Sequence, residues 1–219
     1  MKALYKTFLL TLGLAFLTAC GKEDAVKDYG FGRVYIPQAT VTGIDNSYPI
    51  PLGPFYRNSV YCCSYNQDSG MLDIAVGVIR AGYFAHQEAY SVSLGATEAL
   101  TAAKLKALEE AGTPAAALPV DVCSIPGSLS VPEGESGATC KVRVDLKALA
   151  ARRASFYADG QYRKLVLGLE ISGLNGPDSY SLADQNTSVV ILLDLGSEHW
   201  DSVSADKPES QVRSLFPFD

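Results

Sequence analysis

A short stretch near the end of the sequence has the composition of a saccharide-binding site. Trp200 is the only tryptophan of the chain, and Glu198, His199 and Asp201 lie beside it. The flat face of an indole ring can stack on the apolar C–H groups of a sugar, while polar neighbours bond the sugar hydroxyls. We favour the other interpretation, in which Trp200 folds back and covers the open end of the core, and keep the saccharide role as the alternative.

A second aromatic pair is a further candidate for stacking on a sugar ring. Tyr83 and Phe84 are adjacent in the sequence RAGYFAHQ, which follows a predicted strand and reads as a loop. The candidate residues for glycan binding are therefore Trp200, Tyr83 and Phe84.

The sequence contains no recognisable catalytic constellation. It has no G-x-S-x-G motif, and no glycine-rich phosphate-binding loop follows a predicted strand. Glu170 and Asp194 lie on late strands and could be neighbours, as an acid–base pair of carboxylates requires. A solvated sheet face explains these two carboxylates better. We therefore expect a protein that is not an enzyme and needs no cofactor, with a small hydrolase as the remote alternative.

Four cysteines could form disulfides or remain free buried thiols: Cys62, Cys63, Cys123 and Cys140. Four cysteines allow three pairings. Cys123 and Cys140 lie in nearby predicted strands, so a Cys123–Cys140 disulfide is the predicted pairing. A metal site is disfavoured, because adjacent Cys62 and Cys63 do not have the C-x₂₋₄-C spacing of zinc ligands.

The first 19 residues have the pattern of a secretory signal. Lys2 and Lys6 give a basic start, and residues 7–19 carry no charge. A membrane-spanning helix needs about 20 apolar residues, so this run is too short to span, but it suits the apolar part of a signal peptide. Residues 1–19 are therefore set apart from the fold.

Leu17, Thr18, Ala19 and Cys20 resemble the bacterial lipobox. The resemblance implies cleavage before Cys20 and lipidation of its thiol, which would anchor the chain to a membrane through several acyl chains. An ordinary signal peptide with a cysteine at its cleavage site is the alternative. Residues 20–28 are charged, have little to bury, and read as a flexible tether.

Residues 20–219 carry 16 basic and 24 acidic residues, a net charge of −8. No basic run is present, so we expect no nucleic-acid partner. An acidic surface also argues against binding to anionic lipid headgroups. The lipid on Cys20, and not the protein surface, would hold the chain at the membrane.

Alternating apolar residues predict that 29–197 forms one all-β domain, a β-sandwich with one or two short helices in its connections. The strands SVYCCSY and MLDIAVGVIR form a hairpin, Tyr90, Val92 and Leu94 share a strand face, and Cys140, Val142, Val144 and Leu146 share another. TSVVILLDL is apolar on both faces and is expected inside a sheet. The proline of RVYIPQATVTGI suits an edge strand, and residues 198–219 form a C-terminal tail.

Two helices interrupt the strand pattern. The spacing predicts a helix from Glu98 to Ala111, capped by Thr97 and ended by Gly112, with Leu100, Ala103, Ala107, Leu108 and Ala111 on its apolar side. Asp145 is expected to cap a shorter helix over residues 146–153. A Pro/Ala linker is expected between the first helix and the sequence PVDVCSI.

Several ordered motifs resemble the immunoglobulin-like N-terminal domain, long of unknown function, of surface lipoproteins in Bacteroides-type glycan-utilisation systems. The matching stretches are Val34–Ala39, Leu118–Pro119, Val131–Gly134 and Val142–Asp145. The resemblance implies an immunoglobulin-like antiparallel β-sandwich. In that family such a domain often precedes a family-18 glycosidase domain or a lectin-like module.

The resemblance also gives a meaning to the residues after the lipidated cysteine. Lys22, Glu23 and Asp24 resemble the surface-export signal of such lipoproteins, which implies display on the outer face of the outer membrane; a generic solvated tether is the alternative. We therefore expect a non-catalytic surface lipoprotein that binds a polysaccharide or oligosaccharide, or assists another outer-membrane lipoprotein or a transporter. A structural, adhesin-like scaffold that binds protein is the alternative.

Overall fold

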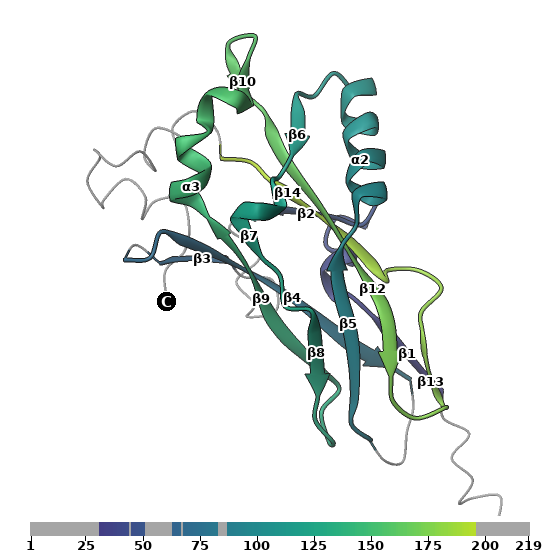
Figure 1. Ribbon diagram of the computed structural model, residues 1–219. Coiled ribbons are helices and arrows are strands. Elements are labelled where there is room, and N and C mark those ends of the chain that lie inside the picture. Colours follow the sequence, from purple (N-terminus) through teal and green to yellow (C-terminus); the bar gives the residue numbers. More distant parts are fainter. Residues whose placement is uncertain (1–30, 44, 51–62, 67, 83–86, 196–219) are drawn as a thin grey trace, which may run out of the picture.

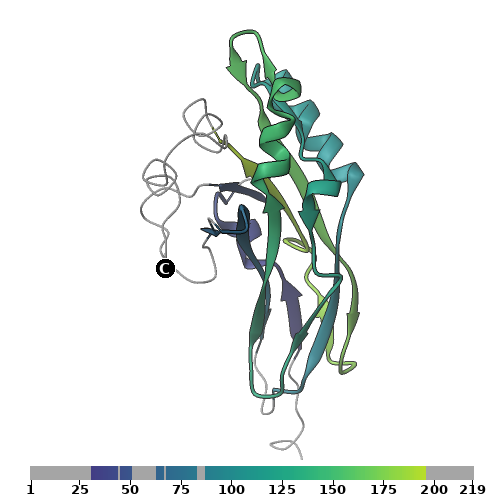
Figure 2. The ribbon, with the colours of Figure 1, turned by 60° about the vertical axis from the view of Figure 1, so that its left-hand side comes forward.

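Two β-sheets face each other across one apolar core (Figure 1). The computed structural model describes residues 31–43, 45–50, 63–66, 68–82 and 87–195. Figure 2 shows the two layers of the sandwich, with both helices gathered toward one end of the molecule. The predicted all-β sandwich with two short helices is confirmed.

The first sheet is organised around the long strand β4, which pairs antiparallel with β9 along most of its length. Its strand order is β13-β1-β4-β9-β7, and β3 pairs with the other side of β4. The strands are β1 (Gly32–Tyr35), β3 (Cys63–Asn66), β4 (Met71–Ala81), β7 (Cys123–Ser124), β9 (Gly137–Asp145) and β13 (Tyr180–Leu182).

The second sheet is organised around β12, in the order β2-β14-β12-β5-β8 with β6 also beside β12. The strands are β2 (Ser47–Ile50), β5 (Tyr90–Ala96), β6 (Ala115–Ala117), β8 (Ser128–Val131), β12 (Lys164–Asn175) and β14 (Ser188–Leu193). A two-stranded hairpin, β10 (Tyr157–Ala158) and β11 (Gln161–Tyr162), forms a small separate sheet.

The side-chain alternation read from the sequence holds in the strands that line the core. Tyr90, Val92 and Leu94 of β5 are buried, and the predicted hairpin forms between β3 and β4. β14 lies between β2 and β12 and buries residues on both faces, as its apolar sequence predicts.

Three strand pairs are parallel, which corrects the expectation of a purely antiparallel sandwich. β1 pairs parallel with β13, β14 with β2, and β12 with β6. Each pair joins strands that are far apart in the sequence or separated by a long connection, as parallel pairing requires. β6 occupies the stretch expected to be a Pro/Ala linker. Alternation alone could not reveal strand direction, because it shows only which face of a strand is buried.

The longer helix, α2 (Glu98–Glu110), packs on the outer face of β12. The side that contacts the strand differs from the predicted one, which included the alanines. Ala103 and Ala107 are exposed, whereas Leu100, Lys104 and Leu108 are partly buried. The helix comes so close to Gly168 that a Cβ there would lie 2.9 Å from the Leu100 Cβ. The docking site is thus set by a glycine in the sheet rather than by the small residues of the helix.

The two predicted helix caps have different outcomes. Asp145 caps α3 (Leu146–Ala151), because its Oδ1 accepts a 2.9 Å hydrogen bond from the Ala148 amide. The Thr97 side chain makes no capping bond to α2. Instead, the Thr97 amide donates to the Gly168 carbonyl at 2.9 Å, so tertiary contact with β12 fixes the start of this helix.

The chain leaves β1 through a 3₁₀ turn, η1 (Pro37–Thr40), rather than continuing as an edge strand. Pro37 takes the first position of this turn, where the absence of an N–H does no harm. β1 is not an edge strand, since it pairs with both β4 and β13. The next residue, Gln38, is fully buried.

Gln38 completes the hydrogen bonding along one side of β4. On that side, β3 pairs with residues 71–74 and β1 pairs with residues 79–81. Between them, the Gly77 amide donates a 3.1 Å hydrogen bond to Gln38 Oε1. Without this acceptor, the unsatisfied buried amide would lower the free energy of unfolding by about 1–3 kcal/mol.

Replacement of Gln38 by Leu tests this role. We expect Gln38→Leu to lower the free energy of unfolding by about 1–3 kcal/mol, because the buried Gly77 amide loses its acceptor while the side-chain volume is nearly kept. Urea denaturation followed by circular dichroism measures the change. Gln185→Leu, at an exposed glutamine, is the control and should change stability by less than about 0.5 kcal/mol. Equal effects of the two variants would contradict the role assigned to Gln38.

Candidate functional site

Three open cavities are lined by described residues, and one of them has an aromatic wall. The cavity between α2 and the β10–β11 hairpin is about 430 Å³. A second, beside Glu88 and Glu133, is about 520 Å³. The third is about 480 Å³ and lies beside β1; among the described lining residues of the three cavities, Tyr35 in this one is the only aromatic residue. We call the third cavity the Tyr35 cleft; its polar and aromatic wall consists of Arg33, Tyr35, Thr40, Asp184, Gln185 and Asn186.

Strand β1 supplies one wall of the Tyr35 cleft. Arg33 and Tyr35 lie two residues apart and so share the outward face of β1, while Val34 between them is fully buried in the core. The parallel pairing with β13 places Arg33 opposite Ser181. Arg33 Nη1 donates to Ser181 Oγ at 3.0 Å and to the Leu182 carbonyl at 3.3 Å. These bonds hold the guanidinium at the wall of the cavity that Arg33 and Tyr35 both line.

The segment after β13 supplies the other wall. The Ala183 amide donates to the Val34 carbonyl at 2.9 Å, and the Ile36 amide donates to the Asn186 carbonyl at 2.8 Å. These two bonds hold residues 183–186 against the end of β1. Asn186 has a φ of 63°, a left-handed conformation that asparagine tolerates better than most residues. Asp184, Gln185 and Asn186 consequently reach the same cavity as Tyr35.

The polar groups of this cleft are available to a ligand. The side chains of Tyr35, Asp184, Gln185 and Asn186 form no hydrogen bond with any residue that the structure describes. Together they offer a hydroxyl, a carboxylate and two carboxamides, next to the guanidinium of Arg33. Such groups can donate to and accept from adjacent hydroxyls of a sugar, while the tyrosine ring offers an apolar face.

Between α2 and β2, hydrogen bonds join Ser47, Lys104 and Asp45. A serine beside a lysine resembles the nucleophile and base of some hydrolases. Lys104 Nζ donates to Ser47 Oγ at 2.9 Å and to Asp45 Oδ2, and Ser47 Oγ donates to Asp45 Oδ1 at 2.6 Å. A nucleophilic serine would need a base that takes its proton and access for a substrate. Here the lysine is ion-paired with Asp45, and Ser47 is 4% exposed. This cluster therefore fastens α2 to the edge strand β2.

The contacts of Asp45 with Lys104 and Ser47 shift the pKa of the Asp45 carboxyl. Burial alone would raise the pKa of this carboxyl, but hydrogen bonds from Lys104 and Ser47 and the charge of Lys104 outweigh burial and lower the pKa below its ordinary value of 3.8. A carboxyl with a lowered pKa in the folded state stabilises the fold fully above the unfolded-state pKa. That stabilisation is lost as the pH falls through the folded-state pKa.

We expect Lys104→Met to destabilise the protein by about 1 kcal/mol at pH 7, a modest value because the Asp45 carboxylate is about half exposed to water. The difference from the unmodified chain should begin to shrink as the pH falls below the unfolded-state pKa of about 4, and should be lost as the pH falls through the lower pKa of Asp45 in the folded chain. Urea denaturation at pH 7, 4 and 3 measures it. Lys106→Met removes an exposed pair with Glu110 on the same helix and is the control. A difference that stayed constant with pH would show that the ion pair contributes nothing.

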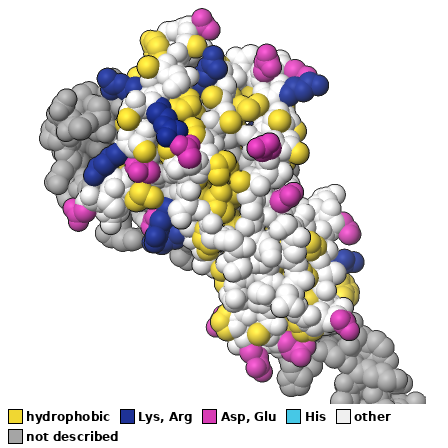
Figure 3. Space-filling view, in the orientation of Figure 1, with side chains coloured by type: hydrophobic (Ala, Val, Ile, Leu, Met, Phe, Trp, Pro, Cys, Tyr) yellow, Lys and Arg dark blue, Asp and Glu magenta, His cyan; other side chains and the backbone are white. Residues whose placement is uncertain are grey.

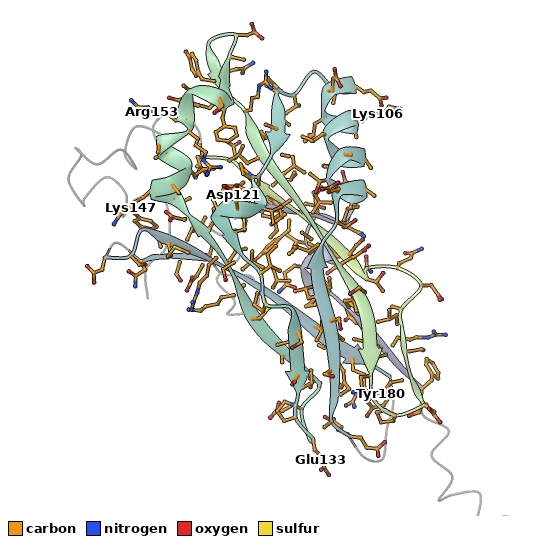
Figure 4. All side chains as sticks on the ribbon, viewed as in Figure 1. Lys106, Asp121, Glu133, Lys147, Arg153 and Tyr180 are labelled. Carbon is orange, nitrogen blue, oxygen red and sulfur yellow. The ribbon has the colours of Figure 1, made fainter. Side chains whose placement is uncertain are left out.

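A buried aromatic cluster fixes the end of the sandwich next to β13. Arg80 is 6% exposed; its guanidinium donates to the Tyr180 hydroxyl and its central carbon lies 4.9 Å from the Tyr180 ring centroid. Tyr180 and Tyr90 form an edge-to-face pair with centroids 5.7 Å apart. Burial raises the pKa of Tyr90 to about 12, although the charge of Arg80 opposes the shift. Figure 4 shows Tyr180 at this end of the molecule. Because Tyr180 begins β13, the cluster also anchors the strand that holds Arg33.

The acidic cavity at this end of the sandwich suits a sugar less well. The described residues that line it are Glu88, Glu133, Asn175 and small residues, and none of these carries an aromatic ring or a positive charge that could face a sugar. In Figure 3, acidic side chains occur at this lower end and also over the upper half, whereas lysines and arginines lie mainly over the upper half. The described lining of this cavity offers no aromatic ring on which a sugar face could stack.

Several residues singled out from the sequence lie outside the described residues. These are the lipidation residue, the export signal and the stacking candidates: Cys20; Lys22, Glu23 and Asp24; Trp200, Tyr83 and Phe84. The signal peptide 1–19, the tether 20–28 and the tail 198–219 lie outside them as well. All of these assignments remain predictions.

The predicted Cys123–Cys140 disulfide is not formed, and both thiols are free. β7 does pair with β9, but the register sets Cys123 opposite Val144, whereas Cys140 lies opposite Val76 on the other side. Four residues along a strand separate Cys140 from Val144, about 13 Å. Burial raises the pKa of Cys123 to about 12, with a further contribution from Asp121, and burial also raises that of Cys140.

The carboxylate pair considered in the sequence is also separated. Glu170 pairs with Ser188 at one end of the β12–β14 ladder, whereas Asp194 follows Leu193 at the other end. Asp194 forms an ion pair of 3.1 Å with Lys164. The two carboxylates therefore cannot act on one bond.

Sequence reasoning did not find the Tyr35 cleft. Tyr35 lies within Val34–Ala39, a stretch singled out only as a motif. Alternation around buried Val34 could have marked Tyr35 as an outward ring. Nothing in the sequence could have placed Asp184 beside it, because more than 140 residues separate the two and the parallel β1–β13 pair joins them.

The described residues contain neither a metal site nor a membrane-spanning helix. No group of three or more histidine, cysteine, aspartate or glutamate side chains there is arranged to hold a metal ion. No helix of the described part is long and apolar enough to cross a membrane.

No family profile matches this sequence, and no curated protein matches it. Solved structures with a similar arrangement all show low identity. A candidate carbohydrate-binding protein from Bacteroides ovatus is 13% identical with a TM-score of 0.45, over 74% of this chain and 36% of the other. A two-domain protein of unknown function from Bacteroides fragilis is 16% identical with a TM-score of 0.39, over 75% of this chain and 45% of the other.

A multidomain protein from Bacteroides ovatus that includes DUF1735 is 14% identical with a TM-score of 0.42, over 74% of this chain and 43% of the other. This chain therefore spans less than half the length of these three proteins. The similar structures are Bacteroides proteins of unknown function or candidates for carbohydrate binding, and likeness at this level carries no argument about a ligand.

Proposed function

We propose that this chain is a non-catalytic saccharide-binding module. The observation that carries the proposal is the Tyr35 cleft, where a tyrosine ring, a held guanidinium and three polar side chains without partners among the described residues line one cavity. A sugar presents an apolar face and a rim of hydroxyls. The cleft offers a counterpart to each: a ring to stack on, and donors and acceptors beside it.

The chemistry of the described residues supports binding rather than turnover. The serine that contacts a lysine is buried and fastens a helix, and the paired-carboxylate hypothesis fails on the strand register. Within the Tyr35 cleft, Thr40 is the one residue with an aliphatic hydroxyl, and it donates to the Pro37 carbonyl at 2.8 Å. No hydrogen bond joins it to Asp184, the one carboxylate among the described lining residues.

We further propose that the module is displayed at a cell surface by a lipid on Cys20. The lipobox-like Leu17–Cys20 and the acidic stretch Lys22–Asp24 support this placement. A saccharide-binding module held at the surface would capture polysaccharide for a glycan-utilisation system, alone or beside a partner lipoprotein or transporter. Several acyl chains on one residue would supply a durable anchor.

The Tyr35→Ala variant tests the binding site. The full chain, produced without lipidation, is screened on a glycan array, and the affinity for the oligosaccharide that binds best is measured by calorimetry. Loss of the ring should weaken that affinity at least about tenfold, equivalent to about 1.4 kcal/mol. Tyr157→Ala is the matched control, since Tyr157 is 50% exposed, contacts Tyr162 and lies outside the three cavities. If Tyr35→Ala binds as well as the unmodified chain, the Tyr35 cleft is not the site.

Metabolic labelling tests the anchor. In a Bacteroides host given labelled palmitate, the chain should incorporate the label, and Cys20→Ala should not, because the acceptor thiol is gone. Cys123→Ala is the control and should retain the label, since Cys123 is half-buried within the folded domain. Alanine at Lys22, Glu23 and Asp24 together should preserve labelling but remove the protein from the reach of external protease. Labelling of Cys20→Ala would contradict the lipid anchor.

A further inference from the structure

We propose that the Tyr35 cleft selects saccharides that carry a carboxylate, as uronic acids do, and that the Arg33 guanidinium binds this carboxylate. The inference rests on the proposed function, because it names the ligand class of the same site. It follows from how Arg33 is held and from what it is not paired with.

Arg33 is oriented through one of its terminal nitrogens. Nη1 makes both hydrogen bonds to β13, at 3.0 Å to Ser181 Oγ and 3.3 Å to the Leu182 carbonyl. No hydrogen bond from Nη2 or Nε to a described residue is formed. A guanidinium held in this way presents its remaining donors in a fixed planar fork, which matches the two oxygens of a carboxylate.

Arg33 forms no ion pair with a described carboxylate, as is also true of Lys147, Arg153 and Arg163, but it is the one of these four that lines the Tyr35 cleft. Six described lysines and arginines form ion pairs with described carboxylates: Lys104, Lys106, Lys141, Arg143, Arg152 and Lys164. Arg33 forms no ion pair with the part of the chain that the structure describes, although the whole chain has 24 acidic residues against 18 basic ones. An exposed cation without a partner, beside a ring and in an acidic protein, is suited to an anionic ligand.

Asp184 limits how much negative charge the ligand can carry. It lines the same cleft but forms no ion pair with Arg33. Its carboxylate can accept hydrogen bonds from sugar hydroxyls, and it repels a second anionic group. The cleft is therefore suited to one carboxylate on Arg33 with a neutral sugar face on Tyr35, rather than to a densely sulfated chain.

The test compares acidic oligosaccharides with their carboxyl-reduced counterparts, which have the same backbone and no charge. Oligogalacturonate, oligoglucuronate and oligomannuronate serve as probes, with the full chain produced without lipidation and affinity measured by calorimetry. At least one acidic probe should bind ten times or more tightly than its reduced counterpart. Arg33→Gln should abolish this preference, and Arg33→Lys should lose most of it, because an ammonium cannot form the planar fork.

Arg163→Gln is the matched control, since Arg163 lines the cavity beside α2 and not the Tyr35 cleft. It should leave the preference unchanged, and thermal unfolding should show that each variant is folded. Equal binding of acidic and reduced probes would overturn the inference while leaving the proposed function intact. Tighter binding of a sulfated oligosaccharide than of every carboxylate probe would also overturn it. Failure to bind any saccharide, charged or neutral, would overturn the proposed function itself.

Discussion

The hydrogen bond from the Gly77 amide to Gln38 Oε1 ties the turn η1 to the central strand β4 of the first sheet. The short turn η1, which carries Gln38, contacts β4 of the first sheet and β2 and β14 of the second. It also redirects the chain from β1 in one sheet to β2 in the other. Between the stretches of β4 that pair with β3 and β1, the buried Gly77 amide would have no hydrogen-bond acceptor. The Gln38 side chain supplies that acceptor. The place where β1 ends, and so the place of the outward residues Arg33 and Tyr35, depends on this contact.

The Tyr35 cleft lies between β1, η1 and the segment that follows β13. Backbone bonds between β1 and the segment after β13 set its walls, and the Arg80–Tyr180–Tyr90 cluster anchors the beginning of β13 in the core. Rigid backbone on both sides allows exposed polar side chains to converge without being bonded to one another, which is the usual design of a small-molecule site. Arg33 is held only by neutral groups, whereas six of the eleven lysines and arginines of the described part form ion pairs with described carboxylates.

Prediction from the sequence succeeded for features that residues close together in the chain determine, and failed for features that depend on contacts between distant strands. Alternation identified the buried faces of β5 and the double-sided burial of β14, because each strand's own residues carry that pattern. Asp145 was identifiable as a helix cap since the bond it makes is three residues away. The buried side of α2 was misjudged because Gly168, on a distant strand, decides where the helix can approach. The disulfide was misjudged for the same reason: pairing of two strands can be guessed, but register cannot.

The sequence by itself determined the β-sandwich class and the two helices, since short-range periodicity encodes both, whereas the lipid anchor that its short motifs indicate stays a prediction. Only the tertiary structure decided which strands run parallel, which thiols stay apart and which side chains share a cavity. The physical reason lies in the distance along the chain. A cleft that joins Tyr35 to Asp184 arises from strand pairing between residues 32–34 and 180–182, and no local pattern of residues records that pairing.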